Sequence, residues 1–144
     1  MNITDDIMQL CDAFGFYYSA ETPSMENVRQ DKVKSNVILW RNIVEDGSIE
    51  ENENGLFCMR RHYQLGIYQD CKLGERGDIL NNQKENLLSL MFDFYRKLSV
   101  RLSQYNWFAY QPAGFQVGYD KNDENKVFCL IDIYFKSPFL NECI

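Results

Sequence analysis

Apolar and polar side chains alternate along the chain from Leu56 to Asp70. Successive side chains of a β-strand point to opposite faces, so this period of two predicts one long, half-buried strand. One face carries Phe57, Met59, Tyr63, Leu65 and Ile67, with Arg61 as the one interruption. The other face carries Cys58, Arg60, His62, Gln64 and Tyr68. The pattern predicts that the first face is buried in a core and that the second face contacts water or a partner.

Two amphipathic helices are predicted by apolar residues at helical spacing. The first covers about Asp5–Ala13, with Thr4 as its N-cap and Gly15 as its stop. The second covers Asn82–Ser103 and opens with a capping box at Asn82–Glu85. The main apolar stripe of the second helix comprises Leu87, Leu90, Met91, Phe94, Leu98 and Leu102.

Three further strands are predicted at Asn36–Val44, Trp107–Tyr119 and Val127–Lys136, because these segments are rich in β-branched and aromatic residues. Pro112 and Gly114 predict a bend or bulge in the second of them. The order is therefore helix, strand, strand, helix, strand, strand. Two hairpins joined by a helix predict a four-stranded antiparallel sheet with both helices packed on one face. We expect residues 1–144 to form a single α+β domain.

The segment Glu45–Gly55 is rich in acidic residues and asparagine and poor in apolar ones. It therefore predicts a solvated hairpin loop between two strands. It lacks the twelve-residue ligand spacing of a calcium-binding loop, and the turn-rich segment Cys71–Asp78 lacks both phosphate-binding glycine patterns. The polar segment Thr22–Lys34 is ambiguous, with one helical turn expected after Pro23.

Charge and composition narrow the class of protein. The formal net charge is −6 and the isoelectric point is near 4.8, which argues against nonspecific nucleic-acid binding. The five cysteines form no CxxC pair, and a single histidine does not complete the usual zinc patterns. We expect reduced thiols, no signal peptide and no membrane span, and hence a soluble chain made in the cytosol.

Candidate catalytic groups do not converge in the sequence. His62 lies mid-strand beside no recognisable nucleophile, and Cys58 lies about 13 Å from it along an extended strand. Asp132 lies between Ile131 and Ile133, so a buried carboxylate there needs a partner such as an arginine from the next strand. We predict a surface or interface role for His62, and no catalytic, cofactor-binding or metal-binding residue.

The succession of elements resembles the tail terminators and related head-to-tail connectors of tailed bacteriophages. The first strand Asn36–Asn42, the acidic segment Glu45–Gly55, the long strand Leu56–Asp70, the helix Asn82–Ser103 and a last strand ending at Leu130–Phe135 carry the resemblance, which covers nearly the whole chain. It rests on element order and length. It implies a ring, commonly six-fold, within the virion, assembled in the cytoplasm of the bacterial host. It also implies contacts with other virion proteins, and neither catalysis nor specific nucleic-acid binding.

A ring needs a heterologous interface, in which one surface of a subunit meets a different surface of the next. We expect the acidic hairpin, Glu45–Gly55, to project from the subunit and to make such a contact. Two other classes remain: an acidic immunity or inhibitor protein that binds a basic toxin, and a small hydrolase. The candidate interface residues are Arg60, His62 and Gln64 on the polar face of the long strand, and Glu50, Glu51 and Glu53 in the acidic hairpin.

Overall fold

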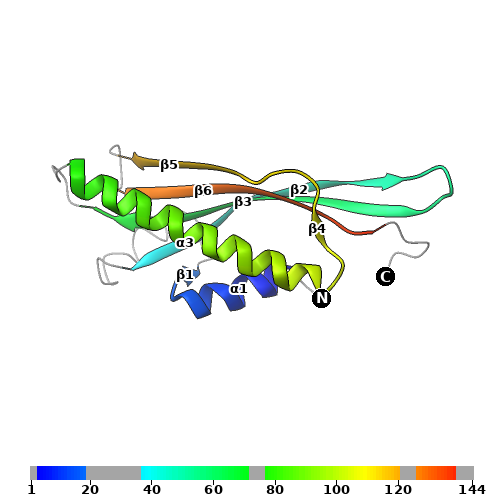
Figure 1. Ribbon diagram of the computed structural model, residues 1–144, viewed down its shortest axis with the longest axis horizontal. Helices are drawn as coiled ribbons and strands as arrows, with labels where there is room; N and C mark the ends of the chain where they lie inside the picture. Colours follow the sequence, from blue (N-terminus) through cyan, green and yellow to red (C-terminus); the bar gives the residue numbers. More distant parts are fainter. Residues whose placement is uncertain (1–2, 19–36, 72–76, 121–125, 139–144) are drawn as a thin grey trace.

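The computed structural model describes residues 3–18, 37–71, 77–120 and 126–138. These residues form an α+β fold, as predicted, with two helices and six strands (Figure 1). The turn expected after Pro23 lies outside the described residues. The elements in chain order are α1 (Ile3–Phe14), β1 (Tyr17–Tyr18), β2 (Ile38–Glu51), β3 (Phe57–Asp70), α3 (Gly77–Ser103), β4 (Phe108–Ala109), β5 (Gly114–Asp120) and β6 (Lys126–Lys136).

The sheet differs from the predicted four-stranded antiparallel one. Its order is β1-β2-β3-β6-β4, and β5 also pairs with β6. The sheet is mixed because β1 runs parallel to β2, whereas the other pairs are antiparallel. The predicted strand Trp107–Tyr119 is divided into β4 and β5 around Pro112, which has no N–H to donate to a ladder. Both pieces pair with β6, which is therefore a central strand.

The prediction of a solvated loop at Glu45–Gly55 is wrong, because β2 continues to Glu51. Three of its acidic side chains, Glu45, Asp46 and Glu50, form ion pairs with basic side chains of β3, which the isolated segment does not reveal. The turn is correspondingly short. Asn52 Oδ1 accepts hydrogen bonds from the backbone N–H groups of Asn54 and Leu56, and Gly55 supplies a positive φ of 75°.

The second helix also begins earlier than predicted. It starts at Gly77, so the predicted capping box at Asn82–Glu85 is wrong and lies inside α3. Asp78 in the first turn favours this start by placing a negative charge at the positive end of the helix dipole. Leu80 packs against the core and extends the apolar stripe backwards. The strands predicted at Leu56–Asp70 and Val127–Lys136 are confirmed within one residue.

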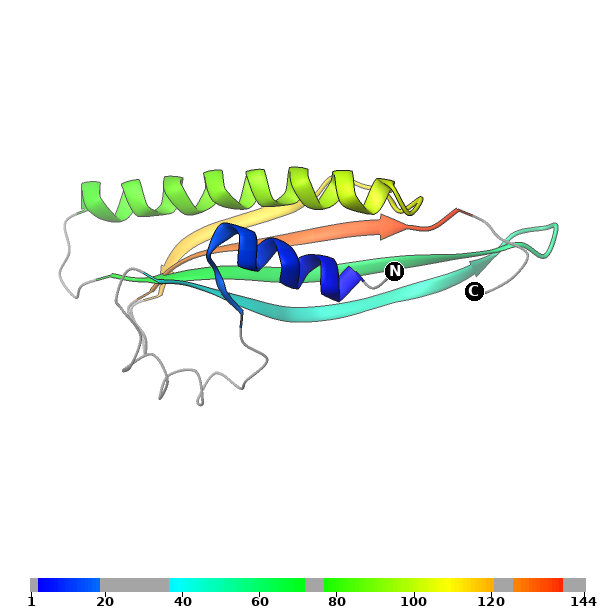
Figure 2. The same ribbon diagram turned by 90° about the horizontal axis from the view of Figure 1, so that it is seen from below.

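One core joins both helices to one face of the sheet. Trp40 is fully buried, and its ring centroid lies 4.4 Å from that of Phe94 on α3 and 6.0 Å from that of Phe16. The two helices run alongside the strands, and the β2–β3 ribbon extends past both of them (Figure 2). The strand residues in the core are Trp40, Tyr63, Leu65, Ile67, Val127, Cys129, Ile131, Ile133 and Phe135.

Candidate functional site

His62 lies on the face of the sheet opposite the core residues, at the centre of three strands. Its register partners are Asp46 on β2 and Tyr134 on β6. The imidazole Nδ1 is 2.8 Å from Asp46 Oδ1, and Nε2 is 2.8 Å from Asp132 Oδ1. The ring also stacks on Tyr134, with the centroids 4.7 Å apart and the planes 11° from parallel. One side chain thus links β2, β3 and β6.

This geometry favours the charged form of His62. Partial burial lowers the pKa of the imidazole, but the hydrogen bonds to Asp132 and Asp46 and their negative charges raise it by more, so the net shift is upward from 6.5. The imidazolium donates from both nitrogens to the two carboxylates. A histidine acting as a base needs one nitrogen free to face a substrate proton. The arrangement therefore serves as a charged cross-link between strands.

The structure differs from the sequence-based expectations for two acidic residues, Asp132 and Asp46. The sequence suggested an arginine as the partner of Asp132, whereas its partner is His62. Sequence reasoning also missed Asp46 altogether, because it counted that residue with a solvated loop. The signal that locates both carboxylates is strand register, since Asp46 lies directly opposite His62 and Asp132 directly opposite its neighbour Gln64.

Two arginines of β3 form further ion pairs with β2, one on each face of the ribbon. Arg60 Nη2 lies 2.8 Å from Glu50 Oε1, and its guanidinium covers the ring of Tyr110 at 4.9 Å. Arg61 pairs with Glu45 on the other face of the ribbon and lies over the ring of Trp107 at 5.8 Å. Cation–π contacts of this kind add to the ion pairs.

The predicted interface residues thus fall into two groups. Arg60, His62 and Glu50 have charged partners within the chain, and Gln64 shares their face of the sheet. Glu51 and Glu53 are exposed at the end of the ribbon, where no ion pair to either is found within the described ranges. The last two carboxylates therefore stay available to a partner.

Three of the four cysteines that the structure describes, Cys11, Cys58 and Cys129, do not provide an activated nucleophile. The Cys58 Sγ lies 3.6 Å from Glu50 Oε2, and burial followed by the nearby Glu50 charge raises the pKa of its thiol. Burial, with a smaller contribution from Asp12, raises the pKa of Cys11 to about 12, and burial raises that of Cys129 to about 11. All three thiols are protonated at neutral pH, whereas thiol reactivity requires the thiolate.

The outer part of the β2–β3 ribbon, whose end extends past the helices, exposes apolar side chains. We call this part of the ribbon the arm: Val44–Glu51, Phe57–His62 and the turn between them. Ile49 and Met59 lie opposite each other on the face that the helices cover elsewhere, and both are exposed, Ile49 at 68 %. A paired apolar patch on a projecting ribbon is typical of a surface that another protein covers.

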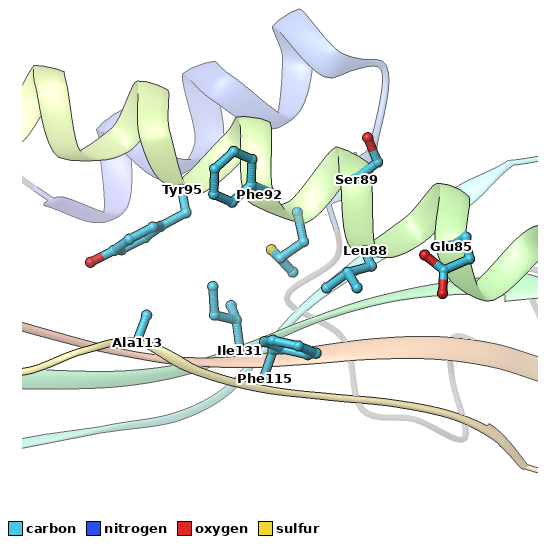
Figure 3. Close-up of a pocket in the computed structure, with 9 residues that line it drawn as sticks. Glu85, Leu88, Ser89, Phe92, Tyr95, Ala113, Phe115 and Ile131 are labelled. Carbon is cyan, nitrogen blue, oxygen red and sulfur yellow. The ribbon is translucent and has the colours of Figure 1, made fainter.

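A second apolar surface lies on α3. A groove of about 540 Å³ separates α3 from β5, with Phe92, Tyr95 and Leu88 on the helix side and Ala113 and Phe115 on the strand side (Figure 3). Another groove, of about 670 Å³, follows α3 on its α1 side and shares Phe92 and Tyr95 with the first. Helical periodicity located the buried stripe of α3, but it did not show that this second stripe is left uncovered.

No protein-family model matches the chain, and no curated protein matches it. Within the described ranges, neither helix combines the length and the apolar character required to cross a membrane. The features of the chain that point to a function are the two apolar surfaces and the ion-paired arm.

Proposed function

We propose that the protein is a structural subunit of a bacteriophage virion, a tail terminator or head-to-tail connector, which forms a ring through contacts with copies of itself. The ring contains several subunits, six in the form we favour, and contacts other virion proteins. It assembles in the cytoplasm of the bacterial host. The resemblance in element order supports this proposal, since a leading helix, a long hairpin, a long helix and closing strands all occur in the fold.

The observation that carries the proposal is the arm. It extends past both helices (Figure 2), and its side chains Ile49 and Met59 are exposed. The uncovered stripe on α3 is a different surface of the same molecule. Two unlike apolar surfaces on one chain are what a heterologous, ring-closing contact requires.

The chemistry of the arm supports binding in place of catalysis. Both nitrogens of His62 are engaged by carboxylates, and Arg60 and Arg61 are engaged by Glu50 and Glu45. These pairs hold the two strands of the arm in register. The arm therefore provides a surface for binding another protein.

The test is the mass of the protein in solution, measured by size-exclusion chromatography with light scattering. We expect a multiple of the 17.1 kDa chain mass at micromolar concentration. The variant Ile49→Asp/Met59→Asp should shift the mass to that of one chain. The control Met8→Asp, which changes an exposed apolar residue of α1, should leave the oligomer intact.

A wild-type chain that stays monomeric at every concentration tested would overturn the ring. Tight, salt-sensitive 1:1 capture of a basic protein by that monomer would instead support the acidic inhibitor class, with Glu51 and Glu53 as contact residues.

A further inference from the structure

The outer end of the arm combines an apolar patch with negative charge. We call Ile49, Glu51, Glu53 and Met59 the tip surface. Glu45, Asp46 and Glu50 have basic partners inside the chain, whereas no such partner for Glu51 or Glu53 is found among the residues that the structure describes. Ile49 and Glu51 are two residues apart on one strand, so their side chains share a face.

The outer side of α3 combines an apolar patch with positive charge. Phe92, Arg96 and Val100 are spaced by four residues and so lie in one row, next to Lys97. We call these four residues the α3 stripe. Phe92 and Val100 are 60 % and 61 % exposed, and both line the groove on the α1 side of α3. The ion pair of Arg96 with Asp93 is long, at 3.6 Å, and solvent-exposed, so it contributes little.

The tip surface does not reach the α3 stripe of its own chain. Figure 2 shows the end of the arm beyond the C-terminal end of α3, whereas the stripe begins in the middle of that helix. A contact between the two surfaces therefore needs a second copy. Their charges are opposite and their apolar residues are comparable in size, as in interfaces with an apolar centre and a polar rim.

We infer that the tip surface of one copy docks on the α3 stripe of the next copy. Ile49 packs against Phe92 and Val100, while Glu51 and Glu53 face Arg96 and Lys97. The inference rests on the proposed function and names the contact that its ring would repeat. Because the two surfaces differ, each copy contacts one neighbour through its tip surface and the other neighbour through its α3 stripe. The copies close into a ring when the rotation between neighbours divides a full turn evenly.

Charge reversal on each side tests this pairing. Glu51→Lys/Glu53→Lys changes the tip surface, and Arg96→Glu/Lys97→Glu changes the α3 stripe. We expect each variant to raise the concentration for half-assembly about tenfold or more at low salt, measured by light scattering. The fourfold variant, which restores opposite charges, should recover most of the assembly. Asp12→Lys/Glu85→Lys makes the same net charge change as Glu51→Lys/Glu53→Lys at other positions and should assemble like the wild type.

The outcomes separate this inference from the proposed function. An oligomeric wild type whose mass is unchanged in both reversal variants overturns the docking but leaves the ring in place. Loss of assembly in each variant without recovery in the fourfold one also overturns the docking, because the two surfaces then do not meet. A monomeric wild type overturns both proposals. Arg96→Glu alone keeps the Lys97 contact with Phe14, so a folding defect in the double variant does not obscure the result.

Discussion

The two ends of the β2–β3 ribbon are held together by different forces. At the inner end, Trp40 and Ile67 are register partners, both fully buried under the helices. At the outer end, β2 and β3 are joined by Glu45–Arg61, Asp46–His62 and Glu50–Arg60, and Ile49 and Met59 there are exposed. The same two strands therefore pass from a hydrophobic core into a ladder of ion pairs.

The two kinds of interaction contribute different free energies to the stability of the two ends. A buried apolar side chain contributes about 1.5–3 kcal/mol, whereas an exposed ion pair contributes about 0–1 kcal/mol. The inner end is thus part of the cooperative core. Beyond Arg60, the last residue of β3 that pairs with β6, the arm is close to an isolated two-stranded ribbon, which is marginally stable in water. An arm of this kind gains stability when a partner covers it, consistent with the docking proposed above.

The largest expected effect is a loss of stability when an apolar side chain is removed from the inner end of the ribbon, compared with the same kind of change at the outer end. Trp40→Ala should lower the free energy of unfolding by about 3–5 kcal/mol, because it removes the ring packed against Phe94 and Phe16. Ile49→Ala should change it by about 0.5 kcal/mol or less, because that side chain is exposed. Urea denaturation, at protein concentrations at which the chain is monomeric, measures the free energy of unfolding of both variants. Similar losses for the two variants would contradict the division of the ribbon.

An intermediate effect is expected from the backbone of the arm. A Cβ on Gly47 would lie 2.0 Å from the carbonyl oxygen of Arg60, so Gly47→Ala must push β2 and β3 apart. We expect a loss of about 1–3 kcal/mol, together with faster hydrogen exchange in the arm.

Gly114→Ala provides the control for this substitution, because a Cβ there meets nothing within 4 Å. It should leave both the stability and the exchange rates unchanged. Unaltered exchange in the arm of Gly47→Ala would show that the strands tolerate the clash and that the ribbon is looser than its register indicates.

The smallest effect concerns the charge on His62. Its folded-state pKa is raised above the ordinary value of 6.5, so its stabilising contribution is full below about pH 6.5 and is lost as the pH rises through the folded pKa. We expect a contribution of about 1 kcal/mol or less, since Asp46 is 65 % exposed and screened by solvent.

Proton NMR follows this titration without ambiguity, because the chain has one histidine. Asp132→Asn should lower the pKa of His62 more than Asp46→Asn does, because the Asp132 carboxylate is less exposed, at 33 %. Equal pKa values in the wild type and both variants would mean that the carboxylates do not hold the imidazolium in solution.

Local patterns in the sequence predicted most of the elements. The alternation from Leu56 to Asp70 predicted β3, and the helical spacing of Leu87, Met91 and Phe94 predicted α3 and its buried face. Both predictions succeeded because burial of one face imposes a period on neighbouring residues. The extension of β2 to Glu51 was missed because its stabilising partners lie on another strand.

The α+β class and the buried faces of β3 and α3 could be predicted from the sequence, because they depend on residues close together in the chain. The strand register and the uncovered surfaces, in contrast, depend on contacts between distant parts of the chain. Asp46 and Asp132 lie 16 and 70 positions from His62, and pairing of three strands brings both to its ring. Contacts over such separations depend on how the whole sheet is assembled, so no local period encodes them.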